Sequence, residues 1–151
     1  MVKKSLAVLS VIVFVIAFTA VFAAQAAFGA YIEFKPPYYY APGNALGVVN
    51  SFFFTFFFSL LFFGYAAPLA LGIEAVKYAS YFASGAANAF DLLFAAPGVL
   101  AALSAIRLGH GVLRDLRGEG SVFDEFSASA RLFIAGVVLL GVLLVVKQFF
   151  Q

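Results

Sequence analysis

Glu74 and Lys77, two charged residues inside an apolar segment, are the strongest candidates for chemistry in this sequence. They are three residues apart, so on a helix they would share one face and could form an ion pair. An ionisable pair within a membrane span is costly and is therefore a candidate functional site. The simpler interpretation is that both residues lie within two turns of the cytoplasmic helix end and extend to the interface. Glu74 suits that interpretation less well, because its side chain is short.

The other polar candidates are isolated along the chain. Asn50 follows the start of a phenylalanine-rich segment, where an unpaired amide would cost several kcal/mol, so we expect a hydrogen-bond partner on another helix. Asn88 and Asp91 are typical of a turn, with Asp91 capping a helix at the outer interface. Pro97 and Gly98 interrupt an apolar segment and could expose backbone carbonyls.

Residue types that support enzymatic chemistry are scarce. The chain has no cysteine and a single histidine, His110. The carboxylates near His110 lack the spacing of metal ligands, and we expect this histidine to be solvated at the cytoplasmic edge. Haem would need axial ligands that the sequence does not offer. We therefore predict a protein that is not an enzyme and has no catalytic residue, metal site or cofactor.

Composition places these residues in a membrane. Of the 151 residues, 65% are hydrophobic and 11% are charged, whereas soluble domains carry about 25% charged residues. Segments 5–32 and 36–73 contain no charge, and each is long enough to cross a bilayer as a helix. The net charge of +2 is too small and too scattered to indicate nucleic acid. The chain is predicted to be an integral membrane protein.

The fold class predicted is all-α, a single polytopic bundle of about five membrane spans. The expected spans are 5–29, 44–66, 69–90, 92–108 and 127–149, with a cytoplasmic loop over 109–126. Prolines and tyrosines in 31–43 indicate a short interfacial loop. Segment 69–90 is the ambiguous one, since a re-entrant hairpin would also be allowed if protein covered its backbone.

Charge asymmetry favours five spans, with the N-terminus in the cytoplasm and the C-terminus outside. Basic residues near helix ends concentrate on the cytoplasmic side. If 69–90 crosses, that side receives six basic residues: Lys3, Lys4, Arg107, Arg114, Arg117 and Arg131. If it does not cross, one of the two basic clusters must face the wrong way. We expect a multi-pass protein of the plasma membrane.

The N-terminal segment has a second interpretation. Two lysines, an apolar run and the small residues of 23–30 are also typical of a secretory signal. We expect an uncleaved first span, held in the cytoplasm at its start by Lys3 and Lys4.

Three arginines and a row of small residues predict contacts within the membrane. Arg107, Arg114 and Arg117 lie beside a helix end and would favour lipid headgroups by about 1 kcal/mol each. The row Ala101, Ala105 and Gly109, at four-residue spacing, is typical of helices that approach closely in lipid. Alanine is common in this chain, so the row is also compatible with composition alone.

From Asn44 onward the chain resembles the stage II sporulation protein M family. The resemblance rests on a second span with Asn44 and Asn50, on Ala96-Pro97-Gly98, and on 105–109, followed by a polar loop and an apolar span. It implies several membrane spans, and bacterial members of that family act with cell-wall hydrolases. The family's polar His-Gly…Glu motif is replaced around Pro97 by apolar residues, and its acidic residue near the last helix end is absent. Only architecture is carried over.

Two functions remain open. The first is a non-enzymatic structural or accessory membrane protein that assembles with itself or with other membrane subunits. The second is a small oligomeric transporter or channel, for which Glu74 and the Pro97-Gly98 interruption are the supporting features. Membrane lipids are expected partners in both cases, and nucleic acid in neither.

Overall fold

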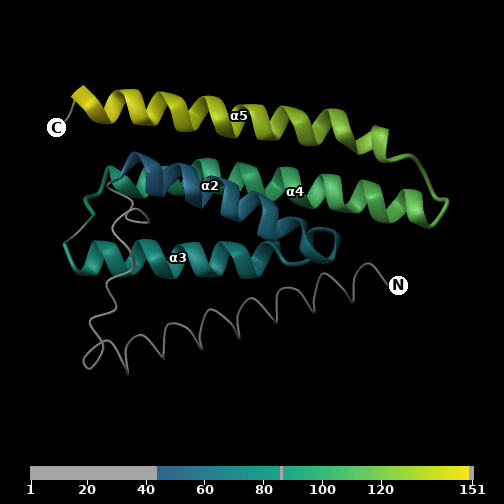
Figure 1. Ribbon diagram of the computed structural model, residues 1–151, viewed down its shortest axis with the longest axis horizontal. Helices are drawn as coiled ribbons and strands as arrows, with labels where there is room; N and C mark the ends of the chain where they lie inside the picture. The colour runs from purple at the N-terminus through teal and green to yellow at the C-terminus, as the bar shows by residue number, and fades with distance from the viewer. Residues whose placement is uncertain (1–43, 86, 150–151) are drawn as a thin grey trace, which may run out of the picture.

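The structure is a computed structural model that describes residues 44–85 and 87–149, and over these residues it is entirely helical. The elements in chain order are α2 (Ala45–Leu60), the short 3-10 helix η2 (Leu61–Gly64), α3 (Ala67–Ala83), the 3-10 helix η3 (Asp91–Phe94), α4 (Ala95–Leu116) and α5 (Val122–Phe149). The long helices lie side by side, with each reversing the direction of the one before (Figure 1). The expected helix 5–29 and loop 31–43 lie outside the described residues.

Within the described residues, three helical segments are long and apolar enough to cross a membrane. They are Ala45–Gly64, Asp91–Leu116 and Val122–Phe149. This is what the composition predicts, because a chain with so few charges must satisfy its backbone groups within helices if lipid surrounds it. The all-helical class expected from the sequence is thus confirmed over the described residues, and three of the helices there are apolar enough for the expected membrane location.

The helix expected over 44–66 begins as predicted and ends earlier. The Asn44 side chain caps α2 by accepting a hydrogen bond from the backbone N–H of Leu46 at 2.9 Å. The helix stops at Leu60, and Phe62, Phe63 and Gly64 then adopt positive φ angles of 53°, 59° and 93°. This left-handed turn reverses the chain into α3. The expectation of an unbroken helix to residue 66 is wrong, because hydropathy does not register a turn made of phenylalanines.

The expected loop over 109–126 is mostly helical, so this prediction is wrong at both its ends. Helix α4 continues to Leu116 and α5 begins at Val122, which leaves only residues 117–121 as the connection. Gly118, with φ of 65°, lies in this connection. A run of charged residues favours a loop, but here the charged residues occupy helical extensions beyond the apolar part of α4 and α5.

The expected interruption at Pro97 and Gly98 is also wrong. Pro97 lies in the first turn of α4, where a missing N–H breaks no intrahelical hydrogen bond. Its side chain is buried, and a methyl group at Gly98 would lie 3.8 Å from Oγ1 of Thr55 on α2. The two residues therefore begin α4 and bring it close to α2.

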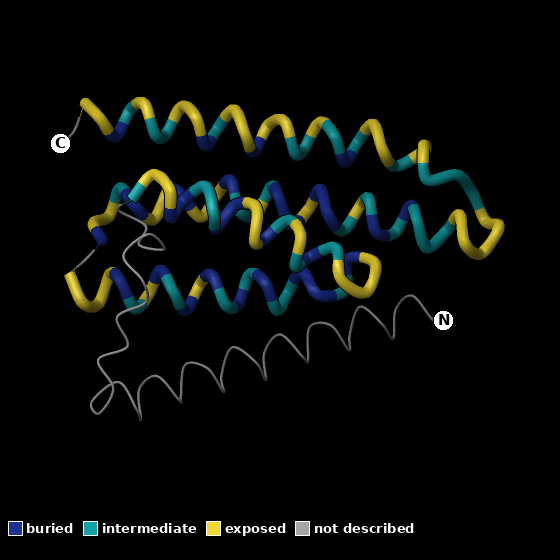
Figure 2. Tube along the Cα trace, in the orientation of Figure 1, coloured by how far each residue is buried: buried dark blue, intermediate teal, exposed yellow. Residues whose placement is uncertain are grey.

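Helix α4 is the central helix of the bundle, in contact with α2, α3 and α5. Its small residues Ala101 and Ala105 are fully buried, and Gly109 is buried as well, which confirms that the row packs closely. Figure 2 shows α5 at the edge of the bundle with a mostly exposed outer side. Phenylalanines fill the space between α2 and α5, where the ring of Phe133 lies 4.7 Å from that of Phe56.

Candidate functional site

Glu74 and Lys77 meet in the interface between α2 and α3. Lys77 Nζ lies 2.5 Å from Glu74 Oε2, which confirms the predicted pairing on one helix face. The same ammonium group donates a hydrogen bond to the Ser51 hydroxyl of α2. The Lys77 and Glu74 side chains are only 16% and 12% exposed. The simpler interpretation, in which both side chains extend to a helix end, is therefore wrong, because they point to a polar partner inside the bundle.

A second buried ion pair joins η3 to the end of α5. Lys147 Nζ lies 2.5 Å from Asp91 Oδ1, and the two side chains are 11% and 4% exposed. The ammonium group also lies 5.8 Å from the ring centroid of Phe94, within range of a cation–π contact. Sequence analysis missed this pair. The predicted topology places Asp91 and Lys147 on the same side of the membrane, and this shared side is the sequence feature that could have indicated their pairing.

The turn before Asp91 is the one that the sequence predicts, but the expectation that Asp91 caps a helix is wrong, because Asp91 is the first residue of η3 and follows the cap residue Phe90. The Asn88 N–H donates to Asp91 Oδ2 at 2.9 Å, and the Asp91 N–H donates to Asn88 Oδ1 at 3.0 Å. This reciprocal pair satisfies two backbone donors where the chain enters η3. Asp91 therefore has two roles, with one carboxylate oxygen in the turn and the other on Lys147.

Tyr78 lies between the two ion pairs. Its side chain is part of the core, and both Glu74 and Asp91 act on it electrostatically. The Lys77 ammonium group lies 5.6 Å from the centroid of its ring. One buried tyrosine thus separates the two charged pairs within the same half of the bundle.

A serine pair links α4 and α5 midway along their contact. The Ser104 hydroxyl lies 2.8 Å from the backbone carbonyl oxygen of Ser129. In return, the Ser129 hydroxyl lies 2.9 Å from the backbone carbonyl oxygen of Ser104. Both side chains are buried. Sequence spacing does not predict this pair, since serines in an apolar helix usually bond to their own backbone.

Charged side chains also join α4 to α5. Glu125 of α5 lies between two arginines of α4, at 3.2 Å from Arg107 and 3.5 Å from Arg114. Arg117 is exposed just past the end of α4, so the three arginines do not form one cluster. His110 is half-buried and its ring lies 5.3 Å from that of Tyr65.

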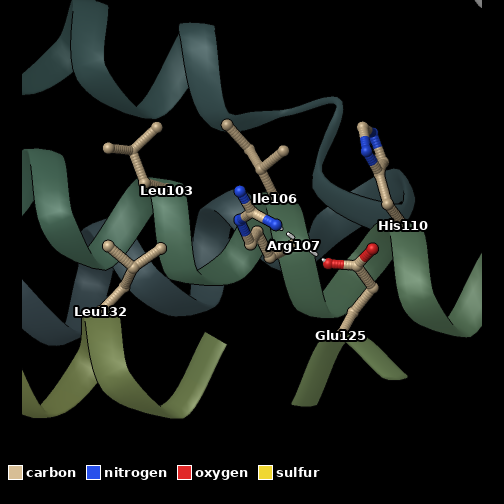
Figure 3. Close-up of a pocket in the computed structure, with 6 residues that line it drawn as sticks. All are labelled: Leu103, Ile106, Arg107, His110, Glu125 and Leu132. Atoms are coloured by element: carbon tan, nitrogen blue, oxygen red, sulfur yellow. Dashed lines mark hydrogen bonds and ion pairs between the residues drawn. The ribbon is translucent and has the colours of Figure 1, made fainter. Parts of the chain in front are cut away.

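Beside the Arg107–Glu125 contact is a pocket of about 450 Å³ between α4 and α5. Its lining combines three aliphatic and three polar side chains: Leu103, Ile106, Arg107, His110, Glu125 and Leu132 (Figure 3). The sequence places His110 beside Arg107, but spacing along the chain does not predict that Glu125 and Leu132 of α5 lie opposite them.

Among the described residues, Asn50 lacks the partner on another helix that the sequence predicts. It is half-buried, and its side chain makes no hydrogen bond to another residue in 44–85 or 87–149, so that expectation is wrong for the described residues. Within those same ranges, no three His, Cys, Asp or Glu residues come close enough to hold a metal ion. The polar groups that do come together form pairs across helix interfaces, which can hold helices in register or carry charge in a low-dielectric environment.

Comparison with family models, with curated proteins and with solved structures finds no significant match.

Proposed function

We propose that this chain is a multi-pass structural or accessory protein of the plasma membrane. It would have no enzymatic activity and would assemble with itself or with other membrane subunits. The observation that supports this role is the use of buried charge. Glu74 pairs with Lys77, and Asp91 pairs with Lys147, each within the bundle. The Asp91–Lys147 pair joins η3 to α5, and Lys77 joins α3 to α2 through its hydrogen bond to Ser51. Both ion pairs neutralise buried charge.

The physical reason is the cost of burying charge. An unpaired ion in a low-dielectric interior costs several kcal/mol, and a close partner of opposite charge offsets much of this. The Asp91–Lys147 pair fixes the register of α5 against η3. The Ser104–Ser129 pair fixes the register of α5 against α4. Polar contacts used in this way fix one arrangement of the bundle, as a scaffold requires.

We further propose five spans, with the N-terminus inside and the C-terminus outside. Helix α3 runs beside α2 and α4 in the opposite direction to each (Figure 1), which supports a crossing segment over a re-entrant hairpin. Arg107, Arg114 and Arg131 would then lie at the cytoplasmic end, and Asp91 with Lys147 at the outer end. Resemblance to the stage II sporulation protein M family agrees with this architecture and names no functional residue.

Broad apolar faces support assembly in the membrane plane. The outer side of α5 exposes five aliphatic residues: Ile134, Val137, Val138, Val142 and Val145. Helix α2 and the turn after it expose five more large ones: Phe53, Phe54, Phe57, Leu61 and Phe62. In a bilayer these faces contact lipid or another subunit, and they leave ample surface for a partner.

The test is the composition of the particle in its native membrane. The protein is extracted in a mild detergent without overexpression, and the mass and the polypeptides of the particle are measured. We expect either a defined homo-oligomer or other polypeptides in fixed ratio. A monodisperse monomer without co-purifying polypeptides would contradict the accessory role.

Ion or proton transport is the second candidate, and the Glu74–Lys77–Ser51 cluster is the observation that favours it. Ionisable residues inside the apolar part of a bundle often mark transport paths. The interruption at Pro97 no longer supports this function, since α4 is continuous there. Flux is measured in liposomes with the wild type, with Glu74→Gln and with Glu119→Gln, an exposed control. Flux lost only in Glu74→Gln would favour transport, and no flux in any sample would exclude it.

A further inference from the structure

The pocket between α4 and α5 changes from apolar to polar along its length. Its α4 side is formed by Leu103, Ile106, Arg107 and His110, which are spaced so that they share one helix face. Leu103 and His110 are seven positions apart, which is a rise of roughly 10 Å along the helix axis. Leucine lies at one end of this face, and arginine and histidine lie at the other.

Helix α5 repeats the same gradient on the opposite side of the pocket. Because the two helices are antiparallel, Leu132 faces the level of Leu103, and Glu125 faces the level of Arg107 (Figure 3). The aliphatic end of the pocket therefore adjoins the apolar part of both helices, and its polar end lies where their charged extensions begin.

The polar end is lined by one arginine, one histidine and one carboxylate, namely Arg107, His110 and Glu125. Glu125 lies 3.2 Å from Arg107, and it also lies 3.5 Å from Arg114, which is outside the lining. The Arg107 side chain is 54% exposed, which leaves N–H donors accessible from the pocket. A group with several acceptor oxygens would accept hydrogen bonds from these donors.

We propose that the pocket binds a membrane phospholipid, with the phosphate diester on Arg107 and His110 and the start of an acyl chain along Leu103, Ile106 and Leu132. The oxygens of a phosphodiester can accept from the N–H donors of Arg107 that remain accessible beside its contact with Glu125. Free phosphate would leave the aliphatic half of the pocket without a ligand. This inference requires a membrane setting and does not depend on the accessory or transport role.

The proposal is tested on the full-length protein, purified in an uncharged detergent and freed of native lipid. The midpoint of thermal unfolding is measured with dioctanoyl phosphatidylglycerol, with inorganic phosphate, and with dioctanoylglycerol, which has the chains without the phosphate. Because a ligand of the folded state raises its stability, we expect the phospholipid to raise the midpoint and the other two to leave it unchanged at equal concentration. An equal rise with phosphate alone, or with dioctanoylglycerol alone, would overturn the assignment.

Two variants locate the site. Arg107→Gln removes the charge at the polar end, and Leu103→Trp fills the aliphatic end without touching the Arg107–Glu125 contact. We expect each to lower the apparent affinity for the phospholipid at least about tenfold, the scale of one lost charge-assisted contact. Arg131→Gln is the matched control, because Arg131 is exposed and lies outside the pocket lining. Equal affinities in Arg107→Gln, Leu103→Trp and the control would overturn the proposal.

Discussion

At the scale of single residues, the buried ion pairs decide what a substitution does. Asp91 and Lys147 are among the least exposed charged side chains that the structure describes, and each is the other's counter-charge. Removing one partner leaves an ion in a low-dielectric environment, whereas removing both leaves two neutral groups that can still hydrogen-bond. The pair is therefore best studied by changing its members separately and together.

We predict that Asp91→Asn lowers the free energy of unfolding by about 3–5 kcal/mol, because it removes the carboxylate that lies 2.5 Å from the buried Lys147 ammonium group. Lys147→Gln should lower it to a similar extent, and the double variant should lose less than the sum of the two. Unfolding in mixed micelles by a denaturing detergent provides the measurement. Strictly additive losses would show that the two groups do not interact.

At the scale of elements, the closest contact in the bundle is between backbone atoms. A methyl group on Gly109 of α4 would lie 2.2 Å from the carbonyl carbon of Phe63 and 2.6 Å from the nitrogen of Gly64. In return, a methyl group on Gly64 would lie 2.7 Å from the Cα of Ile106. The left-handed turn after α2 is thus seated on α4, and only glycine fits at these two positions.

We predict that Gly109→Ala destabilises the protein by about 1–3 kcal/mol or more, because backbone atoms cannot move aside as a side chain would. Gly141→Ala is the control, since nothing lies within 4 Å of that position on α5. There the loss of a flexible glycine should raise stability by up to about 1 kcal/mol. If the two variants unfold alike, the contact between η2 and α4 is not as close as described.

At the scale of the whole molecule, the antiparallel arrangement places successive connections at opposite ends. Residues 84–90 join α3 to α4 at one end of the bundle, and residues 117–121 join α4 to α5 at the other (Figure 1). If α4 crosses the membrane, these two connections must face different compartments. The chain contains no cysteine, so it provides its own background for labelling.

We predict that Ser84→Cys reacts with a membrane-impermeant thiol reagent in intact cells, and that Glu119→Cys reacts only after the membrane is opened. Both positions are exposed. The expectation follows from the arginine-rich end of α4 remaining in the cytoplasm. Labelling of both cysteines from the same side would contradict a crossing α4, and labelling in the reverse order would contradict the proposed orientation.

The features that could be predicted from the sequence are those that depend on residues close together along the chain. Hydropathy over a window of one span length predicted helices in a membrane, because lipid leaves the backbone few other options. The turn at Asn88 and the pairing of Glu74 with Lys77 followed from short spacings. Each of these involves residues within four positions, and local geometry alone determines which atoms can meet.

Contacts between distant helices were decided only by the tertiary structure. Asp91 and Lys147 are 56 residues apart, and Ser104 and Ser129 are 25 apart. Whether such residues meet depends on the rotation and register of each helix, which packing of the whole bundle sets. The left-handed turn at Phe62 and Phe63 likewise follows from its seat against α4. Composition makes this chain a membrane protein, but helix packing decides which of its few polar groups face each other.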